Sequence, residues 1–176
     1  VLFRSTGSGK STLVNLIPRF YDVSEGSIRI DGVDIREYDV YELRSRLGVI
    51  PQKAFLFNGT IADNIRFGKP DATEEEIIQA AKTAQAYDFI MEKEHGFEEE
   101  ITEGATNVSG GQKQRLSIAR ALVRKPDIYV FDDSFSALDF KTDATLRKDL
   151  KKVTANSIVM VVAQRISSIM DADRIV

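Results

Sequence analysis

The hydrophobic positions of this chain fall into two patterns. Continuous apolar runs lie at residues 47–50, 128–131 and 158–162, and such runs are typical of parallel strands whose two sheet faces are both covered by helices. Residues 27–35 instead alternate apolar and polar positions around Asp31-Gly32, which predicts a compact hairpin. The pattern therefore predicts a buried parallel sheet and a small antiparallel element.

Between the first two apolar runs, the apolar positions take helical spacing. Thr73 precedes Glu76 by three residues, as in a capping box, and opens a helix with one apolar face, formed by Ile77, Ala80, Ala81 and Ala84. Ser109 and Gln112 repeat the capping box at the start of a second amphipathic helix, which Pro126 would stop. A helical segment therefore separates two groups of strands.

These elements predict an α/β fold. We expect a core with a parallel sheet, made of residues 1–54 and 124–176, and a helical subdomain at residues 55–123 inserted between its two parts. The length of 176 residues suits one domain with a real hydrophobic core.

Charge and composition exclude several classes of protein. The formal net charge of −3 argues against a nucleic-acid partner, which would need a basic surface to neutralise phosphates. The absence of cysteine excludes disulfides and thiolate metal sites. The longest apolar run, residues 158–163, is far shorter than the roughly 20 residues of a membrane-spanning helix. Any anion site must therefore be local, and any membrane anchor must lie elsewhere.

A glycine-rich segment near the N-terminus provides such an anion site. It consists of Thr6, Gly7, Ser8, Gly9, Lys10, Ser11 and Thr12, and it leads into a short predicted helix that ends near Pro18. The backbone N–H groups of such a loop, together with a helix N-terminus, bind phosphate oxygens. The P-loop pattern G-x-x-x-x-G-K-[ST] predicts that Lys10 reaches the outer phosphates and that the Ser11 hydroxyl binds Mg²⁺.

One position departs from the P-loop pattern. Its first glycine, which allows a tight turn from strand to loop, is replaced by Arg4. Two explanations stay open: a variant loop, or a foreign opening at residues 1–4 joined to a truncated gene. The chain also stops at residues 173–176, where a new strand would begin. We therefore expect a fragment that is truncated at both ends.

Two carboxylates follow the apolar run at residues 128–131. Asp132 and Asp133 match a Walker B element, in which the first carboxylate holds hydrated Mg²⁺ and the next residue orients the attacking water. Acidic residues also end strands in ordinary turns. The functional interpretation therefore depends on the P-loop earlier in the chain.

The segment Ser109-Gly110-Gly111-Gln112, with the helix that follows it, resembles the signature motif of ABC-type ATPases. The resemblance extends from Thr6 to Val176 and implies the fold of that family, a P-loop NTPase core with a parallel sheet and an inserted α-helical subdomain. It also implies that the signature residues contact the γ-phosphate of ATP held by the P-loop of a partner domain. A capped helix N-terminus suits this role, because it can face an anion.

Other segments match the family in the same order. Gln52 resembles the Q-loop glutamine, which contacts Mg²⁺ and links nucleotide state to the membrane domain. Residues 58–68 look like an exporter-type stretch, and residues 136–139 resemble the D-loop, which implies that Asp139 reaches the partner's site. The resemblance thus implies an ATPase with ATP and Mg²⁺ as cofactors, and places Ser11, Gln52 and Asp132 at the metal.

Two catalytic positions depart from the family. Asp133 stands where the family normally has glutamate; aspartate is one methylene shorter, and a misplacement of about 1 Å can lower a rate about 10²-fold. Gln164 stands where the family normally has the switch histidine, and a glutamine can donate a hydrogen bond to a γ-phosphate but cannot titrate. We expect an impaired catalytic site. His95 lies in a polar loop and is expected to be solvated.

This pair of departures resembles the degenerate half of heterodimeric ABC exporters. The resemblance implies a second ABC ATPase subunit, efficient hydrolysis only in complex with it, and a transmembrane domain on the same parent chain, at the cytoplasmic face of the cell membrane. The alternative is a regulatory nucleotide-binding module with little turnover. Too few residues separate Gln52 from Ser109 for the coiled-coil arms of DNA-repair ABC ATPases, and the Asn-Lys-x-Asp motif of GTPases does not occur.

Overall fold

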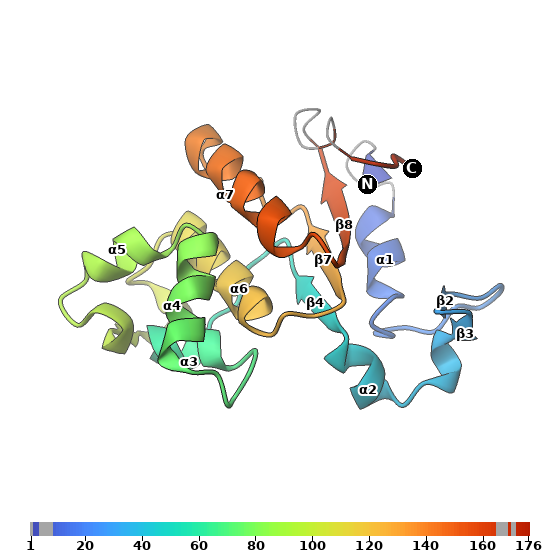
Figure 1. Ribbon diagram of the computed structural model, residues 1–176, viewed down its shortest axis with the longest axis horizontal. Helices are drawn as coiled ribbons and strands as arrows, with labels where there is room; N and C mark the ends of the chain where they lie inside the picture. Colours follow the sequence, from blue (N-terminus) through green and yellow to red (C-terminus); the bar gives the residue numbers. More distant parts are fainter. Residues whose placement is uncertain (1, 4–8, 165–168, 170–171) are drawn as a thin grey trace.

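The computed structural model describes residues 2–3, 9–164, 169 and 172–176. Its main sheet has parallel strands in the order β1-β8-β7-β4. Their bounds are Leu2–Phe3 for β1, Leu47–Ile50 for β4, Ile128–Asp132 for β7 and Ile158–Ala163 for β8. The three apolar runs of the sequence therefore form neighbouring strands, as predicted (Figure 1).

The other elements surround this sheet. The helices are α1 Lys10–Asn15, α2 Val40–Ser45, α3 Ile61–Arg66, α4 Glu74–Thr83, α5 Tyr87–Met91, α6 Gly110–Val123 and α7 Phe140–Val153. Short 3-10 turns lie at Ile35–Glu37, Gly96–Glu98 and Glu103–Ala105. Antiparallel pairs join β2 Arg29–Ile30 to β3 Val33–Asp34, and β5 Gly59–Thr60 to β6 Glu100–Ile101. The predicted α/β class with a parallel sheet is thus confirmed.

Strand β7 is buried on both faces, since all of its residues are buried. Ile128 and Val130 pack in an apolar cluster with α1 and α2. Tyr129 and Phe131 belong to a second cluster, with α6 and α7. Because successive strand residues point to opposite faces, a strand covered on both sides needs a continuous apolar run, and this is the pattern that the sequence carries.

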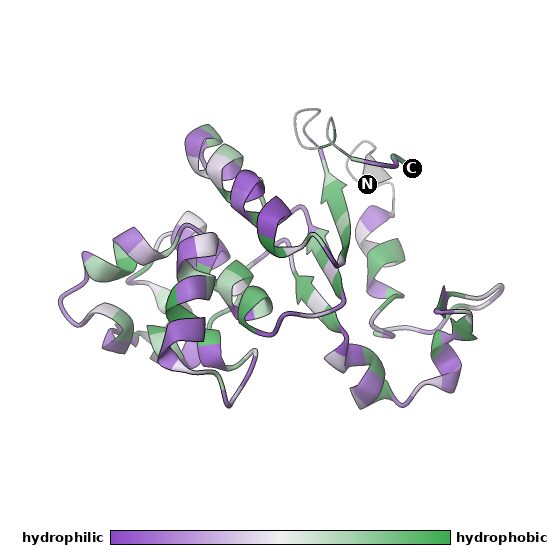
Figure 2. Cartoon of the chain, in the orientation of Figure 1, coloured by the Kyte–Doolittle hydropathy of each residue, from purple (hydrophilic) through white to green (hydrophobic). Residues whose placement is uncertain are grey.

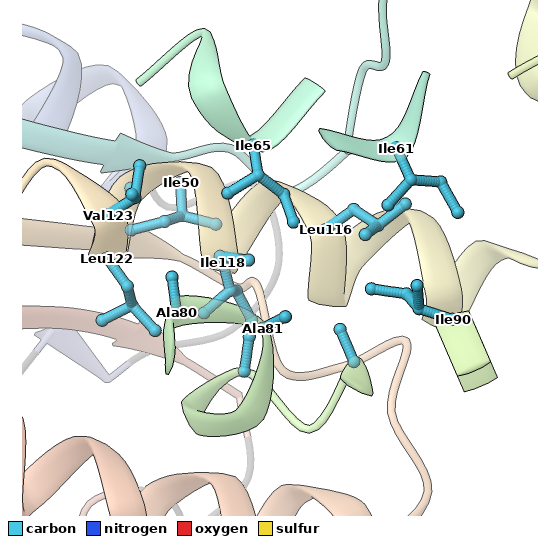
Figure 3. Close-up of a cluster of buried hydrophobic side chains, with 14 of the residues drawn as sticks. Ile50, Ile61, Ile65, Ala80, Ala81, Ile90, Leu116, Ile118, Leu122 and Val123 are labelled. Carbon is cyan, nitrogen blue, oxygen red and sulfur yellow. The ribbon is translucent and has the colours of Figure 1, made fainter. Parts of the chain in front are cut away.

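The second cluster holds the helices of residues 61–123 around α6. Figure 3 shows side chains of α3, α4 and α5 directed toward this helix: Ile61, Ile65, Ala80, Ala81 and Ile90, which meet Leu116, Ile118, Leu122 and Val123. Each buried leucine or isoleucine stabilises such a core by about 1.5–3 kcal/mol. Ile50 of β4 joins the same cluster, so these helices and the sheet share one core. The boundaries at residues 54 and 123 stay a prediction.

Polar residues lie mainly on the outer surfaces of the helices, most clearly along α7, whereas the strands of the sheet are largely apolar (Figure 2). In the part of the chain that the structure describes, no helix combines the length and the apolar character needed to cross a membrane. The predicted short helix is α1, which ends at Asn15, slightly before the expected position near Pro18. The hairpin is confirmed, with positive φ at both turn residues, Asp31 and Gly32, as a type I′ turn requires.

Both predicted capping boxes are present. Thr73 caps α4 and exchanges hydrogen bonds with Glu76. Ser109 caps α6 in the same way with Gln112. These caps satisfy backbone N–H groups that have no partner within the helix, and they fix where each helix begins.

Candidate nucleotide site

The carboxyl ends of three adjacent strands bring four of the predicted site residues together. β7 lies between β4 and β8 and runs parallel to both. Gln52 follows β4, Asp132 ends β7, Asp133 comes next, and Gln164 follows β8. Ligand sites of parallel α/β sheets lie at this edge. The fold therefore brings residues from three segments that are far apart in sequence to one location.

Of the predicted P-loop, the structure describes Gly9 to Thr12. Gly9 precedes α1 with a φ of 82°, a left-handed conformation that glycine adopts without strain. Lys10, Ser11 and Thr12 form the first turn of α1. The predictions for Thr6, Gly7 and Ser8, and the departure at Arg4, lie outside the described residues.

Ser11 contacts the first Walker B carboxylate. Its Oγ donates a hydrogen bond of 3.0 Å to Oδ1 of Asp132, whose residue is only 8% exposed. Hydroxyl and carboxylate oxygens are ligands that suit Mg²⁺, which proteins usually hold through one or two carboxylates together with substrate phosphates. Within the described residues no cluster of three or more His, Cys, Asp or Glu side chains could hold a metal. The donor chemistry of Ser11 and Asp132, one hydroxyl and one carboxylate, fits a metal that is shared with a phosphate ligand.

Asp133 accepts two side-chain amide hydrogen bonds on a single oxygen. Gln52 Nε2 lies 3.2 Å from Asp133 Oδ2, and Gln164 Nε2 lies 2.9 Å from the same atom. The Asp133 residue is 9% exposed. The three residues predicted from separate motifs thus form one hydrogen-bonded group.

The backbone of Asp133 explains how two adjacent carboxylates serve different neighbours. Its φ is 47°, in the left-handed region, where aspartate is among the more tolerated non-glycine residues. The Asp133 N–H donates to the Val162 carbonyl at 3.0 Å, and the Asp133 carbonyl accepts a hydrogen bond of 2.8 Å from Ser136 Oγ. The turn directs Asp132 toward Ser11 and Asp133 toward the two glutamines.

Two buried polar residues at this edge are not among the predicted site residues. Ser134 Oγ donates to the Ile50 carbonyl at 2.7 Å, and Gln114 Nε2 donates to the Pro51 carbonyl at 3.1 Å. Each donor residue is 1% exposed. A glutamine on the apolar face of a predicted helix is a usable signal for Gln114, whereas a serine beside two aspartates is ordinary turn composition.

The signature residues lie at the exposed N-terminus of α6. The Ser109 N–H donates to Gln112 Oε1 at 2.9 Å, and the Gln112 N–H donates to Ser109 Oγ at 3.3 Å. A Cβ added to Gly110 would meet open space among the described residues, whereas one added to Gly111 would lie 3.2 Å from the Ala137 carbonyl. Of the hydrogen bonds between described residues, none joins this motif to Ser11 or to the Walker B carboxylates.

Asp139 of the D-loop-like segment caps α7. Its carboxylate accepts hydrogen bonds from the N–H groups of Thr142 and Lys141, at 3.0 and 3.1 Å. These bonds, that from Thr142 above all, hold the pKa of the Asp139 carboxyl below its usual range. Within this chain Asp139 therefore starts a helix, and its reach toward a partner's site stays a prediction.

A phosphate-loop helix beside the acidic end of a parallel strand defines the class of P-loop nucleotide-binding domains. A family model described as "ABC transporter" matches residues 1–136. An uncharacterized ABC transporter ATP-binding protein of Mycobacterium tuberculosis is 49% identical over 175 residues, which is 98% of this chain and 30% of that protein. A Bacillus subtilis protein, named as a candidate multidrug export ATP-binding/permease protein, is 48% identical over 171 residues, 97% of this chain and 30% of that protein.

The solved structure of a bacterial Atm1-family ABC exporter with ATP bound matches with a TM-score of 0.95 and 41% identity, over 99% of this chain and 30% of that chain. The chain belongs to the ABC transporter family and has the fold of its ATP-binding domain. The fold expected from the signature motif is therefore confirmed. The chain spans about 30% of the length of the curated relatives that it matches.

Proposed function

We propose that this chain is the ATPase domain of an ABC exporter and that its own ATP site retains nucleotide while hydrolysing it slowly. One observation carries this proposal: Asp133 Oδ2 accepts hydrogen bonds from Gln52 and Gln164. A carboxylate oxygen has two lone pairs for hydrogen bonding, so these amides occupy Oδ2 and would compete with a water molecule for the Asp133 carboxylate. Neither amide supplies the positive charge of a histidine.

ATP and Mg²⁺ are the ligands proposed for this site. Lys10 would bind the outer phosphates, and Ser11 and Asp132 would hold Mg²⁺ with Gln52 nearby. When bound, the metal neutralises charge on the phosphates. The hydrogen bond between Ser11 and Asp132 supports this assignment, because it keeps a hydroxyl and a carboxylate together at the first turn of α1.

A second ATPase subunit is the proposed partner. The signature residues 109–112 are capped, exposed at Ser109 and Gly110, and separate from the chain's own Walker B carboxylates, which supports a role at the ATP site of another subunit. A homodimer would contain two impaired sites, so we propose a heterodimer. The relatives include a protein named for both ATP binding and a permease, and this supports a transmembrane domain on the parent chain, with the ATPase at the cytoplasmic face of the membrane.

ATP turnover by the complete parent subunit, alone and mixed with the product of a neighbouring ABC gene, tests the proposal. We expect turnover to appear only in the mixture. Rapid turnover by the subunit alone would overturn the heterodimer and the impaired site. The second candidate function, a regulatory module, is favoured by the same Asp133 contacts, and it predicts that the mixture binds MgATP without hydrolysing it.

A further inference from the structure

The base of the Q-loop is held by two buried side chains. Ile50 ends β4 and Pro51 follows it, and their carbonyl oxygens accept hydrogen bonds from Ser134 Oγ and Gln114 Nε2. Both donor residues are 1% exposed, and Ile50 is fully buried as well, so water cannot readily replace the bond from Ser134. Side chains from other segments thus hold the two consecutive carbonyls that precede Gln52. We name this pair of hydrogen bonds the Q-loop clamp.

The clamp draws on two different parts of the fold. Gln114 belongs to α6, the helix that begins at the signature residues. Ser134 follows β7, and the left-handed turn at Asp133 precedes it directly. The turn that aims the Asp133 carboxylate at Gln52 therefore also brings the Ser134 hydroxyl back to the strand from which Gln52 emerges.

The position of Gln52 depends on this base because the connection is short. Only Pro51 separates Gln52 from the end of β4, and the ring of proline fixes its φ. The Gln52 amide lies 3.2 Å from Asp133 Oδ2, near the outer limit for a hydrogen bond between nitrogen and oxygen. A small rotation of the Ile50-Pro51 backbone would break that contact.

We propose that Ser134, assisted by Gln114, is a positioning residue that sets the Gln52 amide against Asp133. The inference rests on the proposed function for its effect on nucleotide, whereas the clamp itself consists of hydrogen bonds within the chain. Its loss frees the Q-loop while β4 and β7 stay paired, because their backbone ladder from Leu47 to Ile50 is intact.

A nucleotide-free experiment tests the clamp itself. The 176 residues contain no cysteine, so a spin label at Lys53→Cys, an exposed position next to Gln52, reports Q-loop motion in the full parent protein with any other cysteines replaced. We expect Ser134→Ala to raise the label's mobility and Ser134→Thr, which keeps a hydroxyl, to restore it. Ser157→Ala is the matched control, because Ser157 Oγ donates to the Pro126 carbonyl at 3.1 Å, at the opposite end of the sheet. Unchanged mobility in Ser134→Ala, or an equal rise in Ser157→Ala, overturns the proposal.

A binding experiment asks whether Ser134 acts through Gln52. We expect Ser134→Ala to weaken MgATP binding about five-fold, the effect of one lost hydrogen bond, and to have less than about a two-fold effect when Gln52→Ala is already present. A full loss in the Gln52→Ala background would overturn the positioning role. If the unmodified protein binds no MgATP while the spin label responds as expected, the proposed function fails and the clamp stands.

Discussion

The side-chain amide of Gln164, just after β8, donates a hydrogen bond of 2.9 Å to Oδ2 of Asp133, just after the neighbouring strand β7. The two residues that depart from the family pattern are therefore in direct contact. A change at one alters the surroundings of the other, so their effects on hydrolysis are expected to be coupled.

Restoring both residues should activate the chain's own ATP site. The double substitution Asp133→Glu with Gln164→His lengthens the carboxylate and supplies a titratable group, and we expect ATP turnover to rise by about ten-fold to 10²-fold. The measurement is made in a complex whose partner has its own P-loop lysine replaced, so that only this site contributes. Asp133→Asn, with nearly the same shape and no charge, is the control and should give no rise. An unchanged rate in the double variant would contradict the proposed impairment.

The two capping boxes provide a matched pair of substitutions. Ser109→Ala and Thr73→Ala each remove an N-cap hydroxyl that accepts a backbone N–H, and each should lower the free energy of unfolding by about 1 kcal/mol. Only Ser109→Ala should also lower ATP turnover of the complex, because α4 has no proposed contact with nucleotide. Urea unfolding and turnover assays on both variants check this. Equal turnover in the two variants would contradict the proposed role of Ser109 at the partner's ATP site.

Alanine substitutions at two glycines should differ in their effect on stability. A Cβ on Gly68 would overlap the Arg120 carbonyl oxygen, whereas one on Gly110 would meet open space among the described residues. We expect Gly68→Ala to destabilise the parent subunit by about 1–3 kcal/mol through overpacking. Gly110→Ala should leave the thermal midpoint unchanged or slightly higher, since alanine favours helix. A stable Gly68→Ala variant would show that α3 and α6 can separate.

Replacement of Arg120 by lysine should destabilise the folded protein. Its guanidinium donates to the Asn64 carbonyl, to Asn64 Oδ1 and to the Phe55 carbonyl, each at 2.8 Å, and burial lowers its pKa to about 10. An ammonium group cannot reproduce this planar set of donors, so Arg120→Lys should lower the free energy of unfolding by about 2 kcal/mol. Arg124→Lys is the control: Arg124 is exposed and donates to the Ser45 carbonyl at 3.2 Å. Chemical denaturation should resolve the difference.

Acid should weaken the contacts of Glu76. Hydrogen bonds from Lys69 first, then from Lys125 and the Thr73 N–H, lower the pKa of this carboxyl from its usual 4.5 to about 2. A carboxyl with a lowered pKa stabilises the folded state above its unfolded pKa, and this contribution is lost as the pH falls from about 4.5 to about 2. The unfolding midpoint of Glu76→Gln should therefore be less pH-dependent than that of the unmodified protein in this window. Parallel curves for the two proteins would exclude the effect.

Patterns of local spacing account for the elements that could be predicted. The apolar runs of β4, β7 and β8 and the caps at Thr73 and Ser109 depend on neighbours within a few residues, which the sequence displays directly. Helix α7 was harder to predict, because its buried face consists of Asp143, Leu146 and Leu150 among many charged residues. Only the cap at Asp139 marks its start.

Contacts between distant segments account for what was missed at the site. Motif order predicted that Gln52, Asp133 and Gln164 belong to one site, but not that both amides meet the same oxygen. That geometry follows from strand order and from the left-handed turn at Asp133. Ser134 likewise acquires its partner only when β4 pairs with β7, and no local pattern records that pairing.

The composition of the group around Asp133 has a consequence for cells whose internal acidity changes. Gln52 and Gln164 carry side chains that neither gain nor lose a proton at physiological pH, whereas a histidine in the second position would change its charge near neutrality. The two donors therefore keep the same charge through acid stress and recovery. In the proposed exporter, Asp133 would keep these two uncharged hydrogen-bond donors while the proton concentration around the site varies.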